Sequence, residues 1–177
     1  RTKGKEEGMT KMLLVMRHAK SSWKDEDLPD HERPLTKRGK RAARHVGEQL
    51  RAHGMLPDII LSSTAKRARG TVRRLAKGGE YSGMVTFDDS LYLSEISKHL
   101  AALAQLPDTI SSAMLVGHNP TLEELVRALT EQSEPLPTAT VAIITLPIEH
   151  WSELADGAHG HLEGVISDET SEPAKAP

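Results

Sequence analysis

The chain has 177 residues, a formal net charge of −2 and no cysteine. This length fits one domain with a sizeable core and is short for two domains. The small net charge provides no overall basic field, so we expect neither nucleic acid nor a membrane surface as a partner. The lack of cysteine excludes disulfides, thiol nucleophiles and thiolate metal sites, and the simplest expectation is a reducing compartment, the cytoplasm.

The two ends of the chain differ in composition from the stretch between them. Residues 1–11 are highly charged and lack the apolar middle of a signal peptide, so we interpret them as a disordered or added extension. Residues 167–177 mix Ser, Glu, Pro and Ala without apolar periodicity, which predicts a disordered tail. No apolar run is long enough to span a membrane. Residues 12–166 are expected to form a single domain.

Between these ends, short apolar or β-branched runs alternate with stretches of helical periodicity. Strands are expected at residues 12–16, 58–61, 84–87, 113–117, 138–146 and 161–167. Helices are expected at residues 36–53, 65–77, 94–106 and 120–129. This alternation predicts an α/β fold, a three-layer α/β/α sandwich with a mainly parallel central sheet.

Capping residues predict where the helices begin and end. Thr36, Ser94 and Asn119 precede helical stretches, and each is expected to act as an N-cap. The proline directly after Asn119 takes the first helical position in this interpretation. Gly54 and the pair Gly78-Gly79 are expected to end the helices that precede them.

Four charged or polar side chains follow the predicted strands. Arg17 and His18 close the first strand, Arg67 lies in the first helical turns after the second strand, and His118 follows the strand at residues 113–117. Ligands bind at this edge of open α/β sheets. One pocket can therefore hold all four side chains.

These four side chains suit metal-free phosphoryl transfer. Arginine presents a planar, permanently charged fork to the nonbridging oxygens of a phosphoryl group. A neutral histidine, with an unperturbed pKa of about 6.5, is a nucleophile near pH 7, and a second histidine can donate a hydrogen bond or a proton. The protein itself then supplies positioning and charge neutralisation, so neither a metal nor another cofactor is expected.

The same residues belong to four sequence blocks that follow one another in a specific order. The blocks are Arg17 to Trp23 (RHAKSSW), Arg33 to Gly39 (RPLTKRG), Ser63 to Thr71 (STAKRARGT) and Val116 to Pro120 (VGHNP). In this order they resemble the histidine phosphatase superfamily, also called the phosphoglycerate mutase-like family, and most closely its small SixA-type phosphohistidine phosphatases. The resemblance covers residues 12 to about 129. It implies the phosphoglycerate mutase-like fold, His18 as a transiently phosphorylated nucleophile, and Arg17, Arg67 and His118 as the rest of the phosphate pocket.

Two positions depart from the usual pattern of this family. Ala19 stands where the family usually has glycine, and Thr64 stands where proline is common. The added Cβ of Ala19 matters only if this residue requires a positive φ angle. Neither departure touches a reacting atom.

The sequence does not place a proton donor for the leaving group. Asp25, Asp27 and Glu95 are candidates, but no motif selects one of them. An imidazole leaving group, with a conjugate-acid pKa of about 6.5, needs far less protonation than an oxyanion whose reference, water, has a pKa of about 15.7. A missing acid therefore favours phosphohistidine as the substrate, and the short chain leaves little room for a lid over a small metabolite.

We therefore expect a phosphohistidine-bearing protein as the partner and a monomeric enzyme. One alternative is a phosphatase of small phosphomonoesters. A second alternative is a non-catalytic module that binds phosphoproteins.

Several of these residues also have a purely structural interpretation. Arg67 lies within a basic helical stretch, and Arg69 is the alternative phosphate ligand. Trp23 is expected to pack against the sheet rather than line the pocket mouth. His159 and His161 suggest a metal site, but no acidic or cysteine partner is suitably spaced, so none is expected.

The loop at residues 25–32 is strongly acidic, with the sequence DEDLPDHE. Most such runs are simply solvated. If this loop borders the pocket, we expect it to disfavour polyanions such as nucleotides and to favour a basic protein partner.

Overall fold

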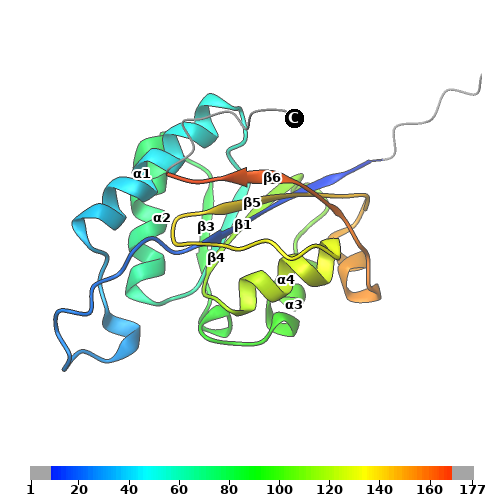
Figure 1. The fold of residues 1–177 in the computed structure, drawn as a ribbon. Coiled ribbons are helices and arrows are strands. Elements are labelled where there is room, and N and C mark those ends of the chain that lie inside the picture. The colour runs from blue at the N-terminus through cyan, green and yellow to red at the C-terminus, as the bar shows by residue number, and fades with distance from the viewer. Residues whose placement is uncertain (1–8, 169–177) are drawn as a thin grey trace, which may run out of the picture.

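A six-stranded sheet forms the centre of the computed structural model, which describes residues 9–168 (Figure 1). The strands are β1 (Lys11–Arg17), β2 (Ile59–Ser62), β3 (Met84–Phe87), β4 (Ser112–Gly117), β5 (Val141–Leu146) and β6 (His161–Ile166). Their order across the sheet is β3-β2-β4-β1-β5-β6. The first four in this order are mutually parallel, and β5 runs antiparallel to β1 and β6. The expected mainly parallel sheet is confirmed.

Helices cover both faces of this sheet. Helices α1 (Lys37–Ala52) and α2 (Lys66–Gly79) lie on one face, and α3 (Ile96–Ala104) and α4 (Thr121–Thr130) lie on the other (Figure 1). Successive side chains of a strand point to opposite faces, so the apolar run of β1 contributes to two cores. Leu14 and Met16 pack into the core under α1 and α2, whereas Leu13 and Val15 pack into the core under α3 and α4. The three-layer α/β/α sandwich is thus confirmed.

The predicted ends of α1 are confirmed. The Thr36 hydroxyl accepts a hydrogen bond of 3.0 Å from the backbone N–H of Gly39. Such a cap stabilises a protein by about 1 kcal/mol. Gly54, directly after the C-cap residue, has a φ of 65°, a backbone conformation that favours glycine.

Helix α2 continues through the Gly78-Gly79 pair, so the predicted stop at this pair is wrong. A Cβ on Gly78 would lie 2.0 Å from the carbonyl oxygen of Arg44 on α1, and a Cβ on Gly47 would lie 2.1 Å from the carbonyl oxygen of Leu75 on α2. The backbones of the two helices are therefore in direct contact. These glycines serve close packing rather than termination.

Ser94 is not the N-cap of α3, which corrects the sequence prediction. Glu95 takes the N-cap position, and its side chain makes no capping hydrogen bond. The Ser94 hydroxyl instead donates to the carbonyl oxygen of Ser90, in the turn that precedes the helix. Because the Ser94 hydroxyl bonds to Ser90, four residues earlier in the chain, it does not cap the helix.

Asn119 does not cap α4 either, and the predicted helix start is wrong by one residue. Pro120 is the N-cap, and the helix begins at Thr121. The Asn119 amide donates hydrogen bonds of 2.9 Å to a Glu123 side-chain oxygen and to the Leu136 carbonyl oxygen. A long-range partner therefore orients this side chain.

The first strand begins one residue earlier than expected, because Lys11 belongs to β1 rather than to an extension. Its buried ammonium group donates to the carbonyl oxygens of Asp108, at 2.7 Å, and Ile110, at 2.9 Å. The predicted disorder at residues 1–8 and 169–177 lies outside the described residues. Within residues 9–168, no helix is both long and apolar enough to cross a membrane.

Candidate active site

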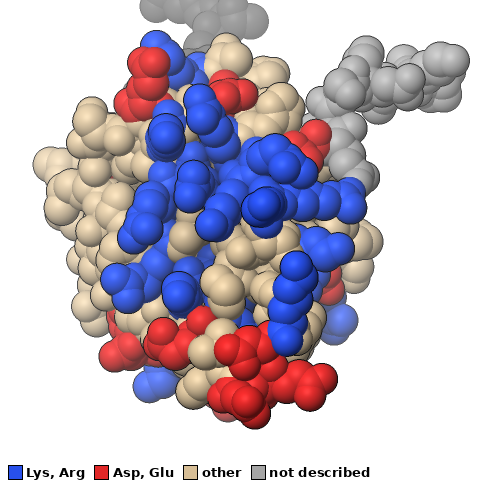
Figure 2. Space-filling model, turned by 90° about the vertical axis from the view of Figure 1, so that its left-hand side faces the viewer, with Lys and Arg blue, Asp and Glu red and all other residues tan. Residues whose placement is uncertain are grey.

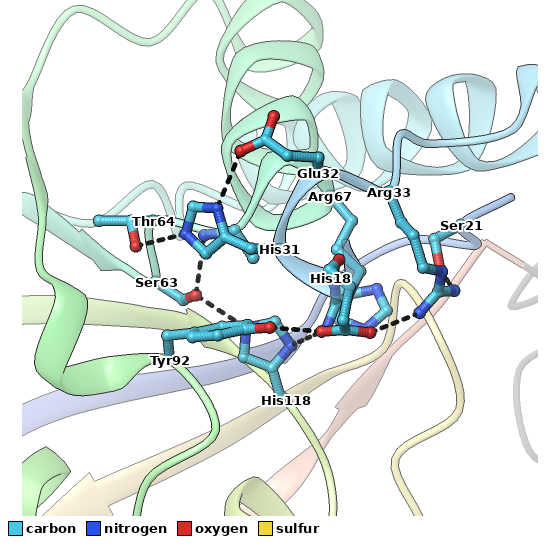
Figure 3. Close-up of polar contacts among 12 residues, drawn as sticks. His18, Ser21, His31, Glu32, Arg33, Ser63, Thr64, Arg67, Tyr92 and His118 are labelled. Atoms are coloured by element: carbon cyan, nitrogen blue, oxygen red, sulfur yellow. Dashed lines mark hydrogen bonds and ion pairs between the residues drawn. The ribbon is translucent and has the colours of Figure 1, made fainter. Parts of the chain in front are cut away.

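The ends of three neighbouring parallel strands bring the predicted site residues together. His18 follows β1, His118 follows β4, and Ser63 follows β2. The backbone N–H of His18 donates to the carbonyl oxygen of Gly117 at 3.0 Å, which fixes the two strand ends in register. The centroids of the His18 and His118 rings are 5.2 Å apart. Figure 3 shows both rings converging with Arg67 and Tyr92 on one small region.

The ring of His18 is held in one tautomer. Its Nδ1 lies 2.7 Å from the carbonyl oxygen of Ala19, and because a carbonyl only accepts, Nδ1 carries the proton. The second ring nitrogen, Nε2, is then unprotonated and has a free lone pair. Burial lowers the pKa of His18, the Ala19 hydrogen bond raises it, and the nearby charges of Arg67 and Arg17 lower it further, to about 4. His18 is therefore neutral at pH 7, as a nucleophile requires.

Arg67 is the arginine that the structure selects from the basic stretch of α2. Its side chain is buried, with 3% of the residue exposed, whereas Arg69 is exposed and lies over the ring of Phe87. Its guanidinium group donates to the carbonyl oxygen of Asp30 at 2.7 Å and to a carboxylate oxygen of the same residue at 2.9 Å. It also lies 3.3 Å from Nδ1 of His118. The alternative assignment to Arg69 is therefore not supported.

His118 is held between Arg67 and Ser63. A guanidinium group only donates, so Nδ1 of His118 accepts from Arg67, and Nε2–H donates to the Ser63 hydroxyl at 2.7 Å. Burial and the neighbouring charges of His18 and Arg67 lower the pKa of His118 to about 3. The one N–H of His118 is directed to Ser63 in this arrangement, so its donation to a phosphoryl group stays a prediction.

Arg17 approaches the site from the end of β1. Its Nη1 donates to the carbonyl oxygen of Leu136 at 3.2 Å, and its buried Nε has no hydrogen-bond partner among the described residues. Leu136 is itself held by Glu123, whose carboxylate accepts from the Leu136 backbone N–H at 2.8 Å. The loop before β5 thus positions Arg17.

Asp30 is a site residue that the sequence analysis missed. One carboxylate oxygen accepts from Tyr92 at 2.5 Å and from Arg67 at 2.9 Å, and the other accepts from Arg33 at 3.1 Å. Burial raises the pKa of Asp30, but the hydrogen bonds from Tyr92, Arg67 and Arg33 outweigh burial and lower the pKa to about 2. The only local signal was the i, i+3 spacing of Asp30 and Arg33, which predicts an ion pair on a single turn.

Comparisons with known proteins show to which family the chain belongs. The sequence model of the histidine phosphatase superfamily (branch 1) matches residues 13–97. An uncharacterized chloroplastic protein of Arabidopsis thaliana is 33% identical over 175 residues, which cover 92% of this chain and 80% of that protein. The chain belongs to the histidine phosphatase superfamily.

The chain is also similar to two further proteins. An uncharacterized protein of Mycobacterium tuberculosis is 33% identical over 153 residues, covering 80% of this chain and 93% of that protein. The solved structure of a candidate phosphohistidine phosphatase SixA from Nakamurella multipartitia is 29% identical with a TM-score of 0.79. That match covers 89% of this chain and 95% of the other. The resemblance drawn from the four sequence blocks is confirmed for the superfamily and its fold.

The two departures from the family pattern fit this pocket. Ala19 is not among the residues with positive φ, so its methyl group causes no backbone strain, and its N–H donates to the Thr71 hydroxyl at 2.9 Å. The Thr64 hydroxyl lies 2.9 Å from Nε2 of His31 and donates to an Asp89 carboxylate oxygen at 2.5 Å. Both residues support the pocket from outside it.

The structure does not bring the three predicted proton donors to the two histidines. Asp25, Asp27 and Glu95 are all exposed. Among the described residues, none of these carboxylates forms a hydrogen bond or ion pair with the site histidines or arginines. The acidic loop does reach the site, but it does so through Asp30.

The prediction that Trp23 packs against the sheet is wrong. The residue is 73% exposed, and the guanidinium carbon of Arg33 lies 3.2 Å from its ring centroid. Trp23 and Arg33 line a surface hollow together with Asp30, next to the site. Trp23 therefore forms a cation–π contact with Arg33 at the surface and is not buried against the sheet.

Proposed function

We propose that this phosphatase hydrolyses phosphohistidine in a protein partner through transient phosphorylation of His18. Superfamily membership supports phosphatase activity. The observation that carries the proposal is the hydrogen bond from Nδ1–H of His18 to the Ala19 carbonyl, because it leaves Nε2 as a neutral nucleophile beside two arginines.

The proposed reaction consists of two displacements at phosphorus. In the first, the Nε2 lone pair of His18 attacks the phosphorus atom, and the P–N bond of the substrate breaks. The bonding electrons pass to the substrate imidazole, which takes up a proton from the solvent. In the second, water attacks phosphorus, the electrons of the new P–N bond return to Nε2 of His18, and inorganic phosphate leaves as a proton of the attacking water is released to the solvent. Arg17 and Arg67 neutralise the nonbridging oxygens, so their charge does the work that a metal ion performs in other phosphoryl-transfer enzymes.

The state of Asp30 favours an imidazole leaving group. A general acid must hold a proton near the working pH. Three donors stabilise the ionised form of Asp30 and lower its pKa to about 2, so this carboxyl holds no proton to give at pH 7. An alkoxide leaving group requires such a proton, whereas imidazole leaves with far less help. A phosphohistidine substrate is therefore favoured over an alkyl phosphomonoester.

The substrate class can be tested with three substrates at one concentration. These are a histidine-containing carrier protein phosphorylated with phosphoramidate, glucose 6-phosphate and 4-nitrophenyl phosphate. We expect kcat/KM to be highest for the phosphohistidine protein and lowest for glucose 6-phosphate. Faster hydrolysis of glucose 6-phosphate would assign the site to small phosphomonoesters instead.

The covalent intermediate can be tested by rapid acid-free quenching after brief exposure to labelled phosphohistidine protein. We expect acid-labile label on the enzyme, and its loss in His18→Ala, together with a fall in kcat of at least about 10³-fold. The control is His159→Ala, which changes a histidine far along the chain from the site blocks. If the wild-type protein binds the phosphoprotein but never carries label, the proposed intermediate is wrong. Release of phosphate would then indicate another mechanism, and no release would indicate a binding module.

A further inference from the structure

The outer surface of α1 and α2 carries a groove with basic walls, distinct from the candidate active site. We call it the basic groove, a cavity of about 380 Å³ whose walls include five cationic side chains. These are Lys40 on α1 and Lys66, Arg69, Arg73 and Arg74 on α2. Figure 2 shows Lys and Arg side chains as a continuous band across this face, with Asp and Glu side chains gathered below it.

Most of the positive charge in the basic groove is not neutralised by the protein. Helix α2 contains no Asp or Glu. Within residues 9–168, Lys40, Lys66, Arg73 and Arg74 form no ion pair, and Arg69 contacts the ring of Phe87 at 5.7 Å. Cations this close repel one another, and an anionic ligand relieves that repulsion.

The basic groove opens next to the active site. Ser63 and Thr64 are consecutive residues that face the two sites: the Ser63 hydroxyl contacts His118, and Thr64 lines the groove. Glu32 also lines the groove, and its carboxylate lies 3.1 Å from Nδ1 of His31, whose other ring nitrogen contacts Thr64. One end of a ligand in the groove therefore lies beside Thr64, next to Ser63 and His31 (Figure 3).

Part of the lining of the basic groove is apolar. Pro34, Leu35 and Gly70 contribute to it, and none of the lining residues is aromatic. An apolar lining accepts aliphatic side chains, whereas single-stranded nucleic acid is held by aromatic side chains on which its bases stack.

We propose that the basic groove binds an acidic polypeptide segment of the phosphorylated partner and so positions the phosphohistidine at the active site. The proposal rests on the proposed function, and it names the kind of partner surface that the enzyme recognises. Helix α2 has 14 residues and is about 21 Å long. An extended peptide rises about 3.3 Å per residue, so a segment of roughly six residues spans this face.

The binding test uses a fluorescent eight-residue peptide of alternating Glu and Leu as the probe, with anisotropy measured at low and high salt. We expect saturable binding that weakens with salt, and a Kd at least about tenfold higher for the double variant R73E/R74E. The matched control is K98E/R127E, which reverses two exposed cations on α3 and α4, with an expected Kd within about twofold of the wild type. Circular dichroism checks that both variants are folded.

Other occupants are distinct outcomes of the same experiment. Tighter groove-dependent binding of a 20-nucleotide single-stranded DNA would overturn the proposal in favour of nucleic acid. Tighter binding to phosphatidylserine vesicles would overturn it in favour of a membrane surface. Self-association that R73E/R74E abolishes would assign the groove to a second copy of the chain, and an unchanged peptide Kd in R73E/R74E would also overturn the proposal.

An activity assay separates this inference from the proposed function. With a phosphohistidine protein that carries an acidic segment near its histidine, we expect R73E/R74E to raise KM by at least about tenfold and to leave kcat unchanged. With phosphoramidate, a small substrate, kcat/KM should not change. Unaltered KM for the protein would overturn the docking role while phosphohistidine hydrolysis stands, whereas a wild type that binds the peptide but never hydrolyses phosphohistidine would overturn only the proposed function.

Discussion

Arg67 and Arg69 lie two residues apart on α2, yet they occupy opposite environments. Arg67 is buried and held by Asp30 and His118, whereas Arg69 is exposed on the outer face beside the ring of Phe87. In a buried pocket, few water molecules screen a charge and fixed partners orient it. On the surface, the same charge is screened by salt within about 10 Å. The inner side of α2 can therefore orient one phosphoryl group, and the outer side can only gather anions by its summed charge.

The largest expected difference between the two sides of α2 is that between the Arg67 and Arg69 variants. We expect Arg67→Ala to lower kcat/KM by about 10²- to 10³-fold on every phosphorylated substrate, because an oriented charge at the developing phosphoryl oxygens is lost. We expect Arg69→Ala to leave kcat/KM for a small substrate within about twofold, since its charge is exposed and screened. Steady-state kinetics with phosphoramidate and a phosphohistidine protein measures both. Equal losses in the two variants would contradict the contrast between the two sides of α2.

The buried histidines should make the stability of the protein depend on pH. The pKa of His18 is about 4 and that of His118 about 3 in the folded protein, against about 6.5 in an unfolded chain. Between pH 6.5 and 4 the unfolded chain binds more protons, so the free energy of unfolding decreases as pH falls through this window. We expect a loss of a few kcal/mol, measured by urea denaturation across the range.

Two variants make this pH prediction specific. His18→Gln should reduce the slope of unfolding free energy against pH, because one buried neutral imidazole is removed. His45→Gln, an exposed position on α1, should leave the slope unchanged. A reduced slope in His45→Gln and an unchanged slope in His18→Gln would mean that an exposed histidine on α1 causes the pH dependence.

The glycine contact between α1 and α2 supports both regions. Gly78→Ala places a Cβ within 2.0 Å of the Arg44 carbonyl oxygen, so the helices must separate. We expect a loss of about 1–3 kcal/mol in unfolding free energy, measured by chemical denaturation. Gly164→Ala is the control, since a Cβ there meets no atom within 4 Å among the described residues. Similar stability for the two variants would contradict the direct backbone contact.

The smallest expected effect concerns the carboxylate of Asp30, which already forms an ion pair with Arg67 in the pocket. Asp30 donates no proton and competes with phosphate for the guanidinium group of Arg67. We expect Asp30→Asn to tighten product inhibition by inorganic phosphate by about three- to fivefold, and Asp25→Asn to change it little. Weaker phosphate binding in Asp30→Asn would instead mean that Asp30 orients Arg67 for the substrate.

The elements and the central site residues follow from the sequence because they rest on local patterns. Apolar runs predict β1 and β4, helical spacing predicts α1 and α4, and the polar residue after each strand predicts where His18 and His118 lie. Strands that are covered on both faces must be apolar throughout, so they are visible without knowledge of their neighbours. The order of the four sequence blocks then identifies the superfamily.

The contacts that orient those residues were decided only by the tertiary structure. Asp30 enters the pocket because Arg67, Arg33 and Tyr92, from separate segments, surround its carboxylate. The Asn119 side chain donates to the carbonyl oxygen of Leu136 in a distant loop instead of capping α4. Residue spacing along a chain encodes which face of an element is buried, but it does not encode which polar partner from another segment will satisfy a given side chain.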